Sequence, residues 1–350
     1  MSRWLFSPRT DLLAFGGVAL ASAAVAFGGR ALGITGETPL WAWLCFVVGI
    51  DVAHVWSTLF RVYLDAEELR RHPLRYAAAP LASYAAGVSL YAVSGQLFWR
   101  LLAYAAAWHF VRQQVGWMAL YGRRAGDGPR QRSFDALATY AVTLGPLLWW
   151  HARLPRPFWW FVENDFTALP HEVGLAALVS HAVIAGAWLL HALRGPRRHW
   201  GKVVLLLSTW LVWFGGIVLA RSDFEFTVLN VALHGIPYLV LLFRYAQGRA
   251  RDGGYGAGRA LLKLGGAGFV AFLVALAFVE ELGWDTAVWH DHPEVFGAWG
   301  LSLPDGLLAL VVPLLALPQL THYVLDGFVW RTREDPKLVP RLGWAAAPDV

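Results

Sequence analysis

Long apolar runs, separated by short segments rich in charge, glycine and proline, recur along the whole chain. A helix that crosses the hydrocarbon core of a bilayer needs about 20 predominantly apolar residues. Ten runs of about this length lie near 12–29, 40–60, 76–95, 97–121, 134–151, 172–193, 202–220, 226–245, 260–281 and 304–330. The pattern predicts an all-α fold, a polytopic integral-membrane bundle of about ten transmembrane helices. Since no stretch is left for a soluble domain, residues 1–350 are expected to form a single transmembrane helical domain.

The composition supports this prediction. Hydrophobic residues make up 57% of the chain and charged residues 15%, whereas a soluble domain carries about 25% charged residues. The 20 tryptophans and 11 tyrosines suit aromatic belts at membrane interfaces. The single cysteine, Cys45, excludes an intramolecular disulfide and a thiolate metal cluster.

Lysine and arginine alternate sharply between the connections. The two ends and every second connection hold 23 of the 29 basic residues, the other connections hold five, and Arg112 lies within a run. Basic connections remain on the cytoplasmic side of a membrane, so both termini are predicted to be cytoplasmic. The pI of about 9.5 therefore reflects topology, and no nucleic-acid partner is expected. The expected location is a bacterial-type inner (cytoplasmic) membrane, crossed several times.

Four histidines lie inside predicted spans, where an ionisable residue costs about 2.5–3.5 kcal/mol and marks a functional site. They are His54, His109, His234 and His322. Each has polar neighbours three or four positions away, which share its helix face. The neighbours are Asp51 for His54, Gln113 for His109, Asn230 and Tyr238 for His234, and Gln319 and Asp326 for His322. The pattern predicts four helices that each carry a histidine and a partner.

Depth is the second feature that these four histidines share. Counted from the first cytoplasmic arginine of each helix, at 1.5 Å per residue, they lie about 10 to 21 Å deep. They are therefore expected to meet in one layer in the cytoplasmic half of the bilayer. His181 is also in mid-span, but its helix face is apolar. We predict that His181 is a lone hydrogen-bonding residue between helices, outside the site.

Imidazole nitrogens next to carboxylates are typical of a transition-metal centre. Such a donor set suits iron, copper or zinc and does not suit calcium or magnesium. We predict that His54, His109, His234 and His322 bind the metal, with Asp51 and Asp326 as ligands or orienting anions. Iron is the expected metal, in a mono- or dinuclear centre, with zinc and copper as alternatives.

Three further residues of these helices are candidates for catalysis. Arg112, Gln113 and Tyr238 are predicted to position substrate or to stabilise charge, with Tyr238 as the proton donor. The segment 65–71 is expected to form a solvated, salt-bridged turn, with Arg61 and Asp65 anchoring the end of the second span at the interface.

The leading functional hypothesis is an integral-membrane, metal-dependent oxidoreductase of the non-haem iron kind. Its substrate would be hydrophobic and lipid-like, and the reaction hydroxylation, desaturation or oxidative cleavage. Membrane lipids, and a cytoplasmic electron donor as one candidate, complete the expected partners. Two alternatives are a secondary transporter with an intramembrane His/Asp relay for protons or ions and a b-type haem protein. A structural or assembly subunit without catalysis is a third. The chain departs from membrane desaturases and hydroxylases in having no dense histidine boxes, and it has no nucleotide-binding motif.

Overall fold

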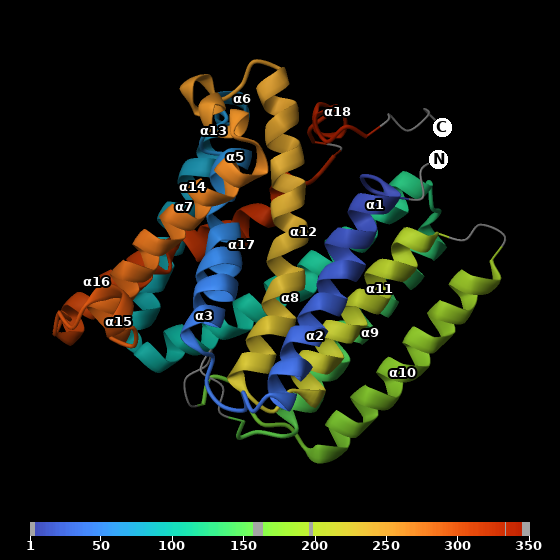
Figure 1. The fold of residues 1–350 in the computed structure, drawn as a ribbon, viewed down its shortest axis with the longest axis horizontal. Helices are drawn as coiled ribbons and strands as arrows, with labels where there is room; N and C mark the ends of the chain where they lie inside the picture. Colours follow the sequence, from blue (N-terminus) through green and yellow to red (C-terminus); the bar gives the residue numbers. More distant parts are fainter. Residues whose placement is uncertain (1–3, 157–163, 196–198, 333, 345–350) are drawn as a thin grey trace. The chain divides into compact units, whose positions relative to one another are not determined.

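Helices account for all the regular structure of the computed structural model, which describes residues 4–156, 164–195, 199–332 and 334–344 (Figure 1). The chain divides into two units. The first unit comprises Met1–Phe46, Ala103–Pro237 and Trp344–Val350, and the second comprises Val47–Leu102 and Tyr238–Gly343. Three of the four boundaries between the units fall inside helices, which are η2 (Trp43–Val52), α8 (Gly95–Ala125) and α12 (Asp223–Arg251), and the fourth lies between Gly343 and Trp344.

The first unit is a set of long helices in mutual contact. Its own elements are α1 (Pro8–Asp11), η1 (Leu12–Gly17), α2 (Val18–Ala31), α3 (Leu40–Ala42), α9 (Pro129–His151), α10 (His171–Arg194), α11 (Trp200–Trp213) and η3 (Phe214–Leu219). Helix α9 packs against α10 and α11, and α11 also contacts α2 (Figure 1).

The second unit holds the remaining elements. They are α4 (Ala53–Trp56), α5 (Thr58–Arg61), α6 (Ala66–Arg71), α7 (Pro73–Val93), η4 (Gly256–Gly258), α13 (Arg259–Lys263), α14 (Gly265–Trp284), η5 (Asp285–Trp289), α15 (Pro293–Phe296), α16 (Asp305–Leu315), α17 (Leu317–Val329) and α18 (Leu338–Arg341). Helix α17 packs against α7 and α4, and α14 packs against α4. Helix α4 follows η2 directly and belongs to the second predicted span. The contacts of α4 with α14 and α17 therefore fix the position of the end of that span.

Several helices are long and apolar enough to cross a membrane. Among the described residues six such helices occur, and they are Pro8–Ala31, Leu40–Arg61, His171–Arg194, Trp200–Leu219, Asp223–Arg251 and Gly265–Trp289. A seventh candidate is the pair α16 and α17, which meet at an angle of 41°. Helices α7, α8 and α9 also coincide with predicted runs, but they do not reach the same apolarity. The helical fold is confirmed, while ten spans and cytoplasmic termini stay predictions.

Helix α10 displays the surface expected of a helix in contact with lipid. Leu175, Val179, Val183 and Leu190 are all exposed along it. Large exposed apolar patches on a protein surface mark contact with a membrane or a partner. The surface of α10 therefore fits a membrane protein.

The charged segment after the second predicted span was wrongly predicted as a solvated turn. Asp65 and Glu68 are 0% and 2% exposed, and Arg61 is 1% exposed. Asp65 caps α6 by accepting the backbone N–H groups of Glu67 and Glu68, as aspartates commonly do. Arg61 pairs with Glu68 at 3.0 Å and donates to the backbone oxygen of Val329 at 2.7 Å. A buried ion-pair network therefore fastens the end of α5 to α17.

Candidate metal centre

Two of the predicted histidines meet within the second unit. His54 lies on α4, directly after the ten-residue π-helical segment η2, and irregular helix of this type is frequent at functional sites. His322 lies in the middle of α17, which packs against α4. Their ring centroids are 5.0 Å apart, with the rings edge to face. Each histidine is 1% exposed, so the pair is enclosed by the protein.

The ring nitrogens of this pair have oxygen neighbours. Nδ1 of His322 lies 2.8 Å from Oγ1 of Thr58. Nδ1 of His54 lies 3.7 Å from Oδ1 of Asp51. A metal-binding histidine normally donates its other N–H to such an oxygen, which fixes the tautomer and the ring orientation. The Thr58 hydroxyl is therefore placed to orient the His322 ring.

Tyr238 and Asp326 form a hydrogen-bonded pair next to these rings. The Tyr238 ring centroid lies 5.8 Å from that of His54 and 5.3 Å from that of His322. The Tyr238 hydroxyl donates to Oδ1 of Asp326 at 2.9 Å, and the Trp330 indole N–H donates to the same oxygen at 2.8 Å. Asp326 thus accepts hydrogen bonds from two aromatic side chains. This arrangement fits a proton acceptor for Tyr238 better than a metal ligand.

The other two predicted histidines meet within the first unit. The ring centroids of His109 on α8 and His234 on α12 are 5.2 Å apart, again edge to face. Phe110 stacks on the His234 ring with 3.6 Å between centroids, which holds that imidazole plane in place. His109 and His234 are 6% and 1% exposed.

The expected helix-face partners of these histidines differ in their surroundings. Gln113 is buried, and neither atom of its side-chain amide has a hydrogen-bond partner among the described residues. A buried amide of this kind needs an explanation such as a bound ligand. Asn230 instead donates to the backbone oxygen of Phe226 at 2.9 Å. Arg112 is exposed and donates to the Tyr140 hydroxyl, so its placement gives no support to a role in catalysis.

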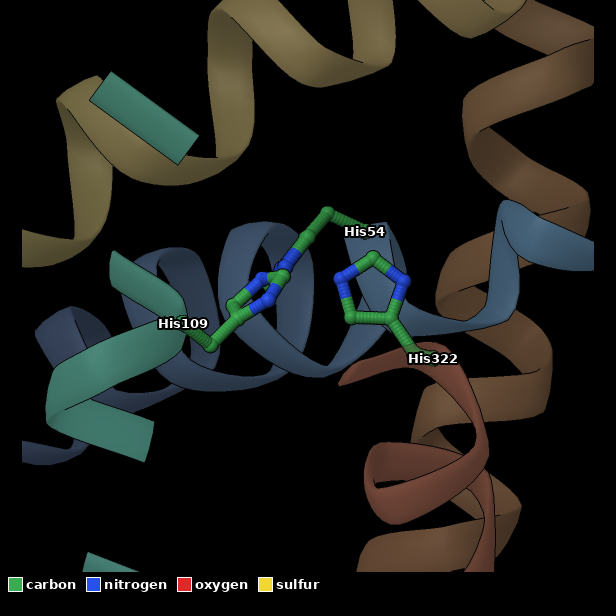
Figure 2. Close-up of side chains that lie close together, drawn as sticks. All are labelled: His54, His109 and His322. Carbon is green, nitrogen blue, oxygen red and sulfur yellow. The ribbon is translucent and has the colours of Figure 1, made fainter. Parts of the chain in front are cut away.

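Ligand atoms of the second unit lie close enough together to hold a metal ion. His54 and His322 each offer one ring nitrogen, and these two atoms lie within 4.8 Å of one another (Figure 2). Asp51 offers a carboxylate oxygen that likewise lies within 4.8 Å of a ring nitrogen of His54. Among the described residues, Asp326 belongs to no such group.

The prediction that His181 is a hydrogen-bonding residue between helices is confirmed. Its Nε2 accepts the indole N–H of Trp210 at 2.8 Å, and its Nδ1 lies 3.1 Å from the backbone oxygen of Ala141. Both ring nitrogens of this mid-helix histidine are engaged between helices. His181 therefore provides a matched control for the four site histidines.

Sequence reasoning missed three residues around the site. Thr58 lies one turn after His54, and Trp330 lies one turn after Asp326, so helical spacing could have indicated both. Glu280 on α14 accepts the indole N–H of Trp56 at 2.6 Å, a contact between helices that no spacing predicts.

Comparison with known proteins provides no family for this chain. No protein-family model, no curated protein and no solved structure matches it. The chemistry of the histidine groups therefore carries the functional argument.

Proposed function

We propose that the protein is an integral-membrane, metal-dependent oxidoreductase with a non-haem iron centre that acts on a lipid-like substrate. The observation that carries this proposal is that His54 offers a ring nitrogen within 4.8 Å of a ligand atom of His322 and of Asp51 in the second unit. A second buried histidine pair, His109 and His234, lies in the first unit with ring centroids 5.2 Å apart. Metal–nitrogen bonds of about 2.0–2.1 Å hold opposite ligand atoms about 4.2 Å apart. Small side-chain movements would bring the ligand atoms of the second unit onto a metal.

The donor set favours a redox-active transition metal. Imidazole nitrogens with one carboxylate, and with coordination positions left open, are typical of non-haem iron oxygenases. His54, His109, His234 and His322 would bind one iron or two, and Asp51 would be a further ligand or an orienting anion. Zinc and copper suit the same nitrogen donors.

Residues around the histidines would prepare the site for chemistry. Thr58 orients His322 through the 2.8 Å contact with Nδ1. Tyr238 is the candidate proton donor, and Asp326 receives its hydroxyl hydrogen bond at 2.9 Å. The buried amide of Gln113 would hold a polar group of the substrate.

The substrate class follows from the surroundings of the histidines. They lie on or next to apolar helices suited to a bilayer, where acyl chains, isoprenoids and oxygen all partition. Hydroxylation, desaturation and oxidative cleavage of such a chain each require the redox chemistry that iron supplies. The proposed location is a cellular membrane, of the bacterial inner type, with both termini on the cytoplasmic side.

The b-type haem alternative is disfavoured by ring geometry. Two axial histidines hold a haem between them, so their rings must lie on opposite sides of the macrocycle. The ring centroids are 5.0 Å apart for His54 and His322, and 5.2 Å apart for His109 and His234, edge to face in both pairs. Neither pair leaves space for a porphyrin.

Elemental analysis of detergent-purified protein tests this proposal. After iron-replete growth we expect stoichiometric iron in the wild type and in His181→Ala, and loss of iron in His109→Ala and His322→Ala. Size-exclusion chromatography checks that each variant is folded. A folded wild type free of transition metal would overturn the proposal and favour a transporter with a His/Asp relay.

A further inference from the structure

Three aromatic residues of the second unit form a series that begins at the histidine pair. Tyr238 lies beside His54 and His322, with ring centroids 5.8 Å and 5.3 Å away. The Trp330 ring is 6.0 Å from that of Tyr238, and the Tyr245 ring is 6.2 Å from that of Trp330. Tyrosine and tryptophan are the side chains that a strong oxidant oxidises by one electron most readily among the aromatic residues, and neighbouring rings at this separation exchange electrons rapidly.

The hydroxyl groups in the series have partners that suit such oxidation. Tyr238 donates to Asp326 at 2.9 Å, and Tyr245 donates to Asp65 at 2.9 Å. A tyrosine that loses an electron becomes strongly acidic, and a carboxylate in hydrogen-bond contact can accept its proton at once. The indole N–H of Trp330 also donates to Asp326, so each member of the series faces a base.

Three other tyrosines of the same unit lack this arrangement, whereas Tyr76, outside the series, donates to Glu68. The hydroxyl groups of Tyr63, Tyr84 and Tyr255 donate to the backbone oxygens of Tyr76, Leu310 and Phe60, respectively. A backbone carbonyl is not a base for the phenolic proton. These residues offer matched controls.

The far end of the series reaches the charged surface of the second unit. Arg249 donates to Asp65 at 2.9 Å and pairs with Glu67 at 3.4 Å. Glu67 in turn pairs with Lys337, whose side chain is 61% exposed. The series therefore runs from the buried histidines to a charged surface where a polar electron donor can bind.

We propose that Tyr238, Trp330 and Tyr245 form a redox chain that carries electrons, one at a time, from this charged surface to the metal centre. This inference rests on the proposed function, because an oxidised metal centre must draw the electrons. Tyr238 would give one electron to an oxidised iron, while its O–H bond breaks and the proton forms an O–H bond on Asp326. Trp330 then returns an electron to Tyr238 while Asp326 returns the proton. Tyr245 reduces Trp330 and passes its own proton to Asp65, and the polar electron donor at the charged surface restores Tyr245 with an electron as Asp65 returns the proton.

Hydrogen peroxide, added in stoichiometric amount to the ferrous protein, provides the test. Peroxide takes up two electrons and two solvent protons, its O–O bond breaks and two waters form. One electron comes from ferrous iron, which becomes ferric, and the other from Tyr238, whose proton passes to Asp326. Freeze-quench electron paramagnetic resonance should detect a tyrosyl radical, and growth on ring-deuterated tyrosine should narrow its signal.

Variants distinguish the chain from adventitious oxidation. We expect the tyrosyl signal to be lost in Tyr238→Phe, weakened in Asp326→Asn and unchanged in Tyr255→Phe, with iron content measured in every sample. An iron-loaded Tyr238→Phe or Asp326→Asn protein with the wild-type radical signal would refute the redox chain but not the proposed metal centre. Wild-type protein that binds iron but forms no tyrosyl radical would also refute the redox chain. A wild type without iron would overturn both proposals.

Discussion

At the scale of single residues, hydrogen bonding distinguishes His181 from His322. His181 has both ring nitrogens engaged, by Trp210 and by the backbone of Ala141. Nδ1 of His322 lies 2.8 Å from Oγ1 of Thr58, a contact that orients the imidazole. Thr58 is therefore the residue through which the orientation of His322 can be tested.

We predict that Thr58→Val lowers metal affinity about 10- to 100-fold, the usual cost of removing a hydrogen-bond partner from a metal-binding histidine. Valine keeps the size of threonine but has no hydroxyl group to form the hydrogen bond with Nδ1 of His322. Thr58→Ser, which keeps the hydroxyl, should retain affinity within a few-fold of the wild type. Competition with a chelator of known affinity measures the effect. Equal affinities for the valine and serine variants would contradict this role.

The sequence singles out candidate site residues more readily than the partners of their side chains. Histidines in apolar runs are conspicuous because each is costly there, so all four could be located. Spacing on one helix, however, reports only neighbours on that helix. The contact of His322 with Thr58, and that of Tyr238 with Asp326, joins different helices. Such contacts depend on packing that no single-helix pattern contains.

At the scale of elements, the position of α12 depends on close packing against η3. A Cβ atom added at Gly216 would lie 2.4 Å from Nδ2 of Asn230 and 3.0 Å from Cβ of Leu229. Asn230 precedes His234 by one turn on α12. The absence of a side chain at Gly216 thus allows the helix that carries His234 to approach η3.

We predict that Gly216→Ala lowers stability by about 1–3 kcal/mol, as overpacking of a core usually does. Gly186→Ala on α10 is the matched control, because nothing lies within 4 Å of the added methyl group. That variant should match or exceed the wild type, since alanine is the better helix former by up to about 1 kcal/mol. Thermal unfolding in detergent measures both. Equal melting temperatures for the two variants would argue against tight packing here.

Helix positions were predictable along the chain, and the proline kink that the sequence indicates at Pro318 coincides with one break. Each predicted apolar run coincides with helix because length and apolarity are local properties. The run 304–330 was predicted as one span, yet α16 ends at Leu315 and α17 begins at Leu317, with a 41° bend between them. Pro318, in the first turn of α17, cannot donate the backbone hydrogen bond that a continuous helix would need.

At the scale of the whole molecule, a network of ion pairs in the second unit gives stability a dependence on pH. Glu67 pairs with Lys337 and Arg341 at 2.9 Å, with Arg249 at 3.4 Å and with Arg71 at 3.7 Å. The hydrogen bond from Lys337 and the charge of Arg341 lower the pKa of Glu67 from its ordinary value of 4.5 to about 2. The folded protein therefore favours the ionised carboxylate.

We predict that Glu67 contributes to the free energy of unfolding fully above pH 4.5 and that this contribution is lost as the pH falls towards 2. The sign follows because, between these values, the unfolded state binds a proton that the folded state does not. Between pH 4.5 and 2 the free energy of unfolding of Glu67→Gln should therefore fall less than that of the wild type. Glu37 is exposed, and the free energy of unfolding of Glu37→Gln should fall as much as that of the wild type. Unfolding curves measured at several pH values provide the comparison. Parallel pH profiles for Glu67→Gln and the wild type would refute the prediction.

X-ray absorption spectroscopy of the iron-loaded protein counts the imidazoles bound to the metal, the property on which the proposed centre depends. We predict a coordination sphere dominated by imidazole nitrogens, with one fewer imidazole in each single alanine variant of His54, His109, His234 and His322. The His181→Ala spectrum should be that of the wild type. Iron bound by oxygen ligands alone, with a spectrum unchanged by all four substitutions, would refute the histidine centre.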